Sequence, residues 1–200
     1  MKIIAVSGVA RAGKDTIANG LEKVINEMNP SIKILRTSFA GQLKSETRDF
    51  IQDKFNIDVF SADGAEKEII RPILIGYGQS RRSQTKGKYW VDVVEKEIFL
   101  EKPDLTIISD IRFADETDDE LSWLKAKNGK LIHVSRYHIE NGKKKFTPPA
   151  GTDEKRNDPK LKSAADYSIC WKDSQDNKEL EEMTRSFCEE FYYKNISYIQ

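Results

Sequence analysis

Two periods of apolar residues alternate along the chain and predict its elements. Short apolar runs with β-branched residues are typical of buried strands. Such strands are predicted at 2–7, 33–38, 105–110, 131–135 and 167–171. Apolar residues spaced three and four apart are typical of helices that cover a core. Such helices are predicted at 14–28, 39–55, 65–77, 89–100 and 115–127. A last stripe, Leu180, Met183, Phe187 and Phe191, predicts a packed helix near the C-terminal end.

Strands that alternate with helices predict an α/β sandwich with about five mainly parallel strands and helices on both faces. We see no internal repeat and no linker, so residues 1–200 are predicted to form a single domain. Residues 79–88 are polar and basic, and they are predicted to form a loop. Residues 137–162 lack hydrophobic periodicity, and they are predicted to be a mobile insertion or lid.

Charge and cysteine content narrow the class of protein. Lys plus Arg and Asp plus Glu both number 33, so the net charge is zero, which argues against a stable nucleic-acid partner or an anionic-membrane partner. The two cysteines, Cys170 and Cys188, are too few for a disulfide framework and indicate reduced thiols. The first residues are apolar over too short a stretch for a signal peptide or a membrane span. These features predict a cytoplasmic location.

A glycine-rich loop follows the first predicted strand and opens the first predicted helix. It reads Gly8-Val9-Ala10-Arg11-Ala12-Gly13-Lys14-Asp15-Thr16. Glycines let the backbone approach a phosphate, and the loop amides and the helix N-terminus then face the anion. Lys14 adds a positive charge that can reach the β- and γ-phosphates of ATP. The context of strand, loop and helix therefore predicts an ATP-binding P-loop, against the alternative of a glycine-rich turn with a surface lysine.

The residue after the loop lysine departs from the usual Ser or Thr, whose hydroxyl binds Mg²⁺. It is Asp15, and Thr16 follows. A carboxylate is also a hard oxygen ligand, so Asp15 is predicted to bind Mg²⁺ directly or through water. The alternative is a favourable negative charge in the first turn of a helix.

A second group of charges, Asp110, Arg112 and Glu116, follows the strand at 105–110, where open α/β sheets place their ligands. Asp110 is predicted to hold Mg²⁺ through water or to touch the acceptor, and Arg112 to grip phosphate with its planar fork. The alternative is a structural ion pair. The chain has no guanine-reading Asn-Lys-x-Asp and no Asp-Glu after this strand, so a small-molecule kinase fits better than a GTPase or a motor ATPase.

Four segments in the same order resemble the phage deoxynucleoside monophosphate kinases, members of the P-loop nucleoside monophosphate kinase superfamily. They are Gly8 to Thr16; Ser38-Phe39-Ala40-Gly41-Gln42-Leu43-Lys44; Arg71-x-x-Leu74-x-x-x-Gly78 with Tyr89-Trp90-Val91; and Ser109 to Glu116 with Ile132 to Arg136. The resemblance covers roughly residues 2–136, and more loosely the strand at 166–170. It implies a three-layer P-loop kinase sandwich with a lid insertion.

The resemblance implies transfer of the γ-phosphoryl group of ATP to a deoxynucleoside monophosphate, with Mg²⁺ as cofactor. The implied acceptor-binding residues are Lys44, Arg71, Gly78, Gln79, Trp90, Asp110, Arg112 and Glu116. Trp90 would stack on a base, against the alternative of a core aromatic. Arg136 would touch ATP phosphates at the hinge of the lid. The implied catalytic residues are Lys14, Arg112 and Arg136, with Arg81 or Arg82 as a further source of positive charge; a homodimer is left open.

The resemblance weakens after Arg136. The family's Asp-x-His-x-Ser-Glu stretch is replaced by Gly151-Thr152-Asp153-Glu154-Lys155-Arg156-Asn157-Asp158. The run at 143–145 could reach phosphates from the lid, but a solvated charge run explains it as well. Two other functions stay open. One is a kinase for another phosphorylated small molecule, such as phosphomevalonate, because such enzymes can share this loop. The other is a nucleotide-binding regulator without transfer activity.

Overall fold

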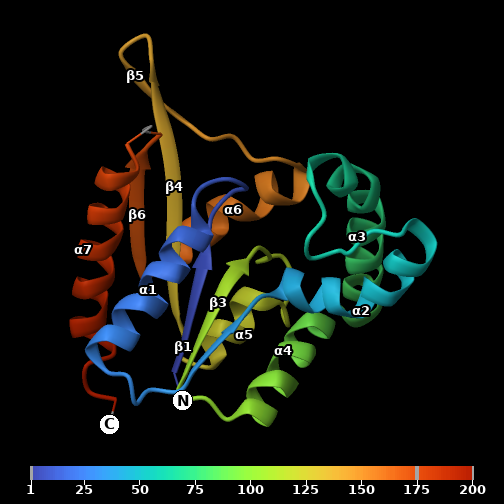
Figure 1. Cartoon of the computed structure of the whole chain (residues 1–200), viewed down its shortest axis with the longest axis horizontal. Helices are drawn as coiled ribbons and strands as arrows, with labels where there is room; N and C mark the ends of the chain where they lie inside the picture. The colour runs from blue at the N-terminus through green and yellow to red at the C-terminus, as the bar shows by residue number, and fades with distance from the viewer. Residues whose placement is uncertain (1, 174–175, 200) are drawn as a thin grey trace.

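The computed structural model describes residues 2–173 and 176–199, and its centre is a mainly parallel sheet (Figure 1). Five parallel strands lie in the order β2-β3-β1-β4-β6, and β5 pairs with β4 antiparallel. The strands are β1 (Lys2–Ser7), β2 (Ile34–Thr37), β3 (Leu105–Ile111), β4 (Lys130–Glu140), β5 (Lys143–Phe146) and β6 (Tyr167–Lys172). The predicted α/β fold with about five mainly parallel strands is confirmed.

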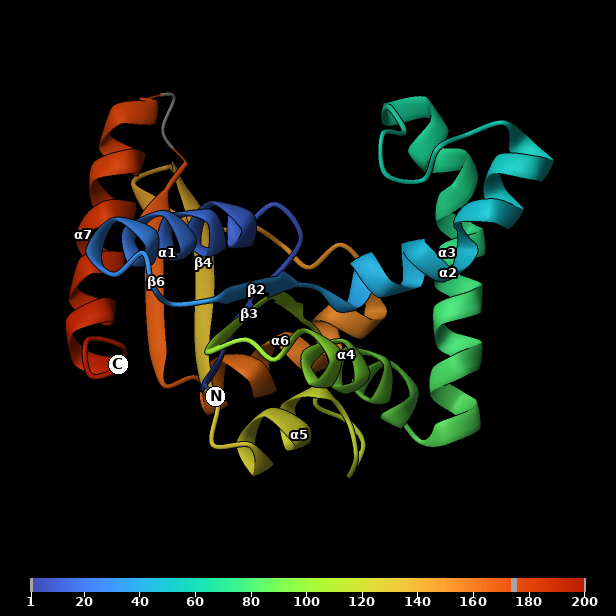
Figure 2. The ribbon, with the colours of Figure 1, turned by 60° about the horizontal axis from the view of Figure 1, so that its bottom comes forward.

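Helices cover both faces of this sheet (Figure 2). They are α1 (Lys14–Met28), α2 (Phe39–Phe55), α3 (Gly64–Thr85), α4 (Lys88–Glu101), α5 (Glu120–Ala126), α6 (Thr152–Ala164) and α7 (Asn177–Asn195). Buried residues of α1 and α7 form one core cluster against the sheet, and residues of α4, α5 and α6 contribute to a second cluster. A small third cluster, centred on Ile51, Val59 and Ile70, joins α2 to α3 beside the sheet.

The centre of the sheet follows directly from the apolar runs. All seven residues of β3 are buried, which is why this strand reads as a nearly continuous apolar stretch. β1 lies between β3 and β4, with Ile4 opposite Ile107 and Val6 opposite Ile132. The carboxyl ends of these strands therefore meet at one edge, and the loop at 8–13 and Asp110 lie there together.

Two predictions about the periphery were wrong. The predicted loop at 79–88 is largely helix, because α3 continues to Thr85. The helix predicted from Asp115 begins only at Glu120, where Asp119 caps it by accepting from the Ser122 amide. The segment 137–162, predicted to be a mobile insertion or lid, contains the end of β4, strand β5 and helix α6. Its role as a mobile insertion or lid remains a prediction.

Two smaller expectations concern thiols and membranes. Cys170 and Cys188 are free cysteines, as predicted, and Cys188 is buried between α1 and α7. Within residues 2–173 and 176–199, no helix is both long and apolar enough to cross a bilayer.

Candidate active site

The loop between β1 and α1 is packed tightly against the sheet, and its two glycines make this possible. Gly8 has a φ of 135°, and a Cβ there would lie 2.3 Å from the carbonyl oxygen of Val134 on β4. Gly13 has a φ of 96°, and a Cβ there would lie 2.2 Å from the ring of Trp171 on β6. The Trp171 indole also donates to the Ala12 carbonyl at 3.0 Å. The backbone of the loop is thus fixed by two strands that are distant in sequence.

Lys14 lies at the centre of the charges in this region. Its ammonium group donates to the carbonyls of Gly8 at 2.8 Å and Val9 at 2.9 Å, and the residue is only 9% exposed. Burial lowers its pKa from the ordinary value, and the positive charge of Arg112 lowers it further. The carboxylates of Glu154, Asp110 and Asp15 oppose this shift in pKa. Lys14 is therefore surrounded by charged groups from the start of α1, from the end of β3 and from α6.

Asp110 connects the end of β3 to the start of α2. Its two carboxylate oxygens accept from the amides of Phe39 and Ala40, each at 2.8 Å. Burial raises the pKa of Asp110, while Arg112, these two amides and Lys14 act in the opposite direction. Because Asp110 holds the first turn of α2, it fixes the segment from Phe39 onward relative to the phosphate loop. This is a positioning contact that the sequence did not reveal.

Glu120 is a second buried carboxylate at this edge. One of its oxygens accepts from the amides of Arg112 at 2.7 Å and Phe113 at 3.1 Å. Its other oxygen lies 3.9 Å from Arg82, whose guanidinium covers the Phe113 ring at 3.5 Å from the ring centroid. Burial raises the pKa of Glu120 to about 8, and the nearby charge of Asp110 adds to the effect. Glu120 thus holds the backbone that carries Arg112.

The side chain of Arg112 is about half exposed and does not form the ion pair considered as its structural alternative. Its nearest carboxylate is Glu154 of α6, at 3.8 Å, instead of Asp110 or Glu116. Glu154 in turn accepts from the loop amide of Ala10 with both oxygens, at 3.1 and 3.2 Å. Figure 1 shows α6 beside the loop that joins β1 and α1, with its N-terminal end toward α3.

This arrangement of a lysine-bearing phosphate loop beside a strand end with Asp and Arg can be compared with known proteins. The family model for phosphomevalonate kinase matches residues 6–130, which include the loop, α2, α3 and the end of β3. The chain belongs to the phosphomevalonate kinase family.

A curated relative and several solved structures are similar to the chain. The phosphomevalonate kinase of Drosophila melanogaster is 24% identical over 129 residues, which are 64% of this chain and 62% of that enzyme. The match thus spans less than two thirds of the relative's length. Shikimate kinase from Acinetobacter baumannii is 11% identical with a TM-score of 0.44, covering 98% of this chain and 96% of that one. Dephospho-CoA kinase from Campylobacter jejuni is 14% identical with a TM-score of 0.45, covering 97% of both.

A third structural neighbour is a nucleotide kinase. Thymidylate kinase from Ehrlichia chaffeensis is 13% identical with a TM-score of 0.40, covering 96% of this chain and 99% of that one. The family model that matches is the one for phosphomevalonate kinase. The finer resemblance to the phage deoxynucleoside monophosphate kinases remains a prediction.

Most of the predicted ATP-binding residues lie in the loop between β1 and α1 or in the first turn of α1. Within the loop, Ala12 is fully buried and Arg11 is exposed with a left-handed φ of 65°, while Thr16 lies in the first turn of α1. Arg136 lies two residues beyond Val134 on β4, in register with Trp171. Its guanidinium pairs with Asp173 at 2.5 Å, and its Nε is buried without a partner. Arg136 therefore lies at the rim of the loop, and its contact with ATP remains a prediction.

The residues around Asp15 fit a magnesium ion. The Asp15 side chain is 86% exposed in the first turn of α1, so its oxygens are free to reach a metal held by phosphates. Both oxygens of Asp110 already accept amide hydrogen bonds, which fits contact through water better than direct ligation. Among the described residues, no group of three or more His, Cys, Asp or Glu could hold a metal ion. Mg²⁺ commonly uses only one or two carboxylates together with phosphates and water.

Arg36 is a partly buried cation beside Asp15 that the sequence pattern did not single out. It lies on β2, 3.8 Å from Asp15 and 3.7 Å from Glu22, and burial lowers its pKa. Its Nη1 has no hydrogen-bond partner. Its position in the sequence could have indicated this place, because Arg36 lies at the carboxyl end of a parallel strand, just before Thr37-Ser38-Phe39.

Two of the predicted acceptor-binding residues share a polar cavity of about 510 Å³. Gln79 and Glu116 line it, and Gln79 also donates to Asp153 of α6 at 3.1 Å. The other lining residues are Arg82, Ser83, Lys86, Gly87, Phe113, Asp115, Asp153 and Arg156. We call this space between α3, the 112–116 loop and α6 the acceptor cavity, after the two predicted acceptor-binding residues that line it.

Other predicted acceptor residues lie outside this cavity. Arg71 is exposed on α3 and pairs with Glu68 at 3.0 Å, while Lys44 on α2 lies 5.7 Å from the Phe60 ring. Gly78 is buried, with room for a Cβ only at contact distance from Leu43. Trp90 is 4% exposed and donates to the Gly78 carbonyl at 3.2 Å. The interpretation of Trp90 as a base-stacking ring is therefore corrected: it is a core aromatic packed edge-on against Tyr89 and Tyr77.

Proposed function

We propose that the chain transfers the γ-phosphoryl group of ATP to the phosphate of a small phosphorylated acceptor. The observation that carries this proposal is the buried Lys14, held against the loop carbonyls at the edge where Asp110 and Arg112 converge. An oxygen of the acceptor phosphate would form the new bond to the γ-phosphorus as the bond to the β–γ bridging oxygen breaks and ADP leaves. No general base is required, because a phosphate oxygen is already anionic near neutral pH.

The residues of this edge divide the work of positioning and charge neutralisation, which dominate phosphoryl transfer. The loop amides and Lys14 would hold the β- and γ-phosphates, and Arg112 would bridge the transferred group and the acceptor phosphate. Asp15 would hold Mg²⁺, which neutralises charge on the phosphate oxygens when bound. Asp110 and Glu120 would act indirectly, by fixing the start of α2 and the backbone of Arg112.

We propose phosphomevalonate as the first acceptor to test. Membership of the family supports it, and so does the character of the acceptor cavity. The aromatic residue among its lining residues is Phe113, and the Arg82 guanidinium covers the face of that ring. A nucleobase needs an accessible aromatic face for stacking, whereas a small aliphatic carboxylate needs cationic and hydroxyl groups. Arg82, Lys86, Arg156 and Ser83 supply these groups, beside the carboxylates of Asp115, Glu116 and Asp153, which line the same cavity.

A deoxynucleoside monophosphate is the second candidate. Four ordered sequence segments favour it, from the loop at 8–16 to the strand at 132–136. With Trp90 in the core, this acceptor would have to bind its base through Gln79 and the backbone near Gly78 instead of by stacking on that ring.

An acceptor-dependent ADP-release assay tests the proposal. The panel contains phosphomevalonate, unphosphorylated mevalonate, and all deoxynucleoside and ribonucleoside monophosphates. We expect ADP release with phosphomevalonate and none with mevalonate. ADP release with nucleoside monophosphates alone would select the second candidate acceptor. ATP binding without ADP release for any acceptor would contradict phosphoryl transfer and support the alternative of a nucleotide-binding regulator.

Four further properties belong to this proposal. We place the reaction in the cytoplasm, consistent with two free thiols and with the ATP requirement. No stable nucleic-acid partner is needed. The segment 137–162 would act as the lid, and a homodimer is the assembly to test by light scattering.

A further inference from the structure

The N-terminal turn of α6 places a carboxylate on the phosphate loop. Both oxygens of Glu154 accept from the Ala10 amide, and one of them also accepts from the Ala150 amide at 2.8 Å. The Glu154 side chain is only 14% exposed. A carboxylate presents two anionic oxygens to backbone donors, as a phosphate does, so Glu154 stands in for a phosphate oxygen on this loop.

The charges around Glu154 match this role. Arg112 lies 3.8 Å from it, and the negative charge of Glu154 is the largest of the influences that raise the pKa of Lys14 against burial. Glu154 thus adds to Asp110 and Asp15 in balancing the positive charges of Lys14 and Arg112. Removing its negative charge leaves more uncompensated positive charge at the loop, which favours binding of another anion.

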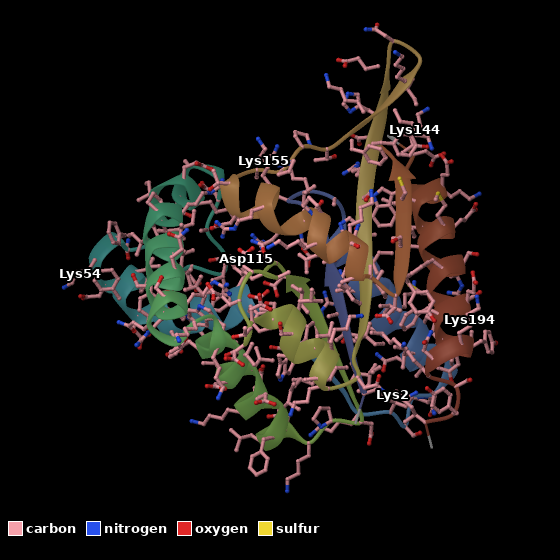
Figure 3. All side chains as sticks on the ribbon, turned by 180° about the vertical axis from the view of Figure 1, so that it is seen from behind. Lys2, Lys54, Asp115, Lys144, Lys155 and Lys194 are labelled. Carbon is pink, nitrogen blue, oxygen red and sulfur yellow. The ribbon has the colours of Figure 1, made fainter. Side chains whose placement is uncertain are left out.

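The rest of α6 is held firmly on the opposite side. Asn157 is fully buried; its oxygen accepts from the Ala114 amide at 2.8 Å, and its nitrogen donates to Asp115 at 2.8 Å. Arg156 and Lys160 also donate to Asp115, each at 2.7 Å. In Figure 3, Asp115 lies on the loop below α6, and Lys155 lies on the outer side of that helix. The position of Glu154 is therefore determined by a docked helix.

We propose that Glu154 is an internal competitor for the nucleotide: it occupies the Ala10 amide and neutralises Arg112 until the phosphates of ATP displace it. The inference rests on the proposed function only in that the loop binds ATP phosphates. Displacement frees the Arg112 guanidinium for the transferred group, so binding of ATP and availability of Arg112 are coupled through one carboxylate. Glu154 is in this sense a positioning residue.

Equilibrium binding of ATP to the full chain tests this. Glu154→Gln keeps the size of the side chain and removes its charge, and we expect it to bind ATP roughly tenfold more tightly, the scale of one charge-assisted hydrogen bond. The matched control is Asp158→Asn, which removes the same charge from the next turn of α6. Asp158 contacts the His133 ring at 2.9 Å and makes no described contact with the loop amides, so the ATP affinity of this variant should stay within about twofold of the wild type.

A second measurement does not depend on nucleotide. Amide hydrogen exchange at Ala10 should be faster in Glu154→Ala than in the unmodified chain, and inorganic triphosphate should restore the protection. Unchanged or weaker ATP binding in Glu154→Gln, or unchanged exchange at Ala10, would overturn the inference. Because these experiments measure binding, a chain that binds ATP but shows no acceptor turnover would contradict the proposed function and leave the Glu154 result readable.

Discussion

The phosphate-loop side of the molecule and the acceptor side are built by different forces. The loop is fixed by backbone packing: Gly8 lies against the Val134 carbonyl and Gly13 against the Trp171 ring. The acceptor cavity is instead bordered by side-chain contacts, with Asp115 accepting from Arg156, Lys160 and the buried Asn157. Contacts between charged groups are screened by salt, whereas the close packing of backbone against a neighbouring strand is not. The geometry of the loop therefore depends on shape, and the border of the cavity depends on charge and hydrogen bonding.

The largest expected effect tests the loop itself. Lys14→Ala should reduce turnover at least about a hundredfold, because it removes a preorganised positive charge from the transferred group. Lys23→Ala, an exposed residue on the same helix, is the control and should leave turnover unchanged. ADP release measures the effect, and circular dichroism checks the fold. A folded Lys14→Ala chain with normal turnover would remove the loop from the mechanism.

The close packing of the loop against the sheet can be tested by a substitution that removes no charge. Gly13→Ala should destabilise the chain by about 2–3 kcal/mol, because a Cβ there collides with Trp171 and the φ of 96° is strained. Gly142→Ala is the matched control: its φ is also positive, at 75°, but nothing lies within 4 Å of the added Cβ. It should cost only about 1 kcal/mol. Urea unfolding compares the free energies of unfolding of the two variants. Equal losses of stability would show that Trp171 moves aside without a further cost.

The difference between the loop side and the acceptor side also explains which features of the fold could be predicted from the sequence. The strands and helices of the loop side follow from apolar periodicity, and the predicted boundaries of α1 and α2 agree with the structure. Trp171 could not be placed under the loop, because that contact joins residues 159 positions apart and leaves no local pattern. On the acceptor side, α6 has no apolar stripe. It is held by Asn157, Arg156 and Lys160, whose long-range polar contacts look like a solvated segment in the sequence.

The candidate site residues divide in the same way: those at strand ends could be predicted from the sequence, and those that reach the site from helices could not. Lys14, Asp110 and Arg112 come together because strand ends converge at one edge of a parallel sheet. Glu120 and Glu154 were missed, because each reaches this edge from a helix whose register cannot be deduced from spacing alone. For Trp90 the sequence left base stacking and core packing open, because an aromatic residue looks the same in sequence whether its ring is buried or free; the structure places it in the core.

A third prediction concerns the boundary between the two regions. Arg112→Lys keeps the positive charge but loses the planar fork, so acceptor KM or kcat should worsen about tenfold while ATP affinity stays nearly normal. A purely structural ion pair with Glu154 predicts the opposite, a lower melting temperature with little kinetic change. Acceptor kinetics, ATP affinity and melting temperature of this single variant distinguish the two. Normal acceptor kinetics in Arg112→Lys and in Arg112→Ala would exclude Arg112 from the site.

A fourth prediction uses the buried Glu120. Its pKa in the folded chain is raised to about 8, above the ordinary value of 4.5, so the folded state binds more protons than the unfolded state between these values. The stabilisation linked to protonated Glu120 is therefore present below about pH 4.5 and is lost as the pH rises toward 8. Glu120→Gln should flatten this decline by on the order of 1 kcal/mol. Parallel pH dependences of unfolding for the two chains would contradict the assignment.

The smallest effect is expected where the loop side meets solvent. Asp15 is 86% exposed, so Asp15→Ala should leave stability nearly unchanged but raise the free Mg²⁺ needed for half-maximal ADP release severalfold. Asp15→Ser should restore part of this dependence, because its hydroxyl is the ligand that most phosphate loops use at this position. If Asp15 only stabilises the N-terminus of α1, both substitutions would lower stability slightly and leave the Mg²⁺ dependence unchanged.

A substitution of Arg36 makes this test more specific. Arg36 pairs with Asp15 at 3.8 Å, so Arg36→Gln should leave the carboxylate freer to bind the metal. A lower Mg²⁺ requirement in Arg36→Gln, lost again in the double variant with Asp15→Ala, would assign the metal to Asp15 and connect the exposed end of α1 to the rigid loop beneath it.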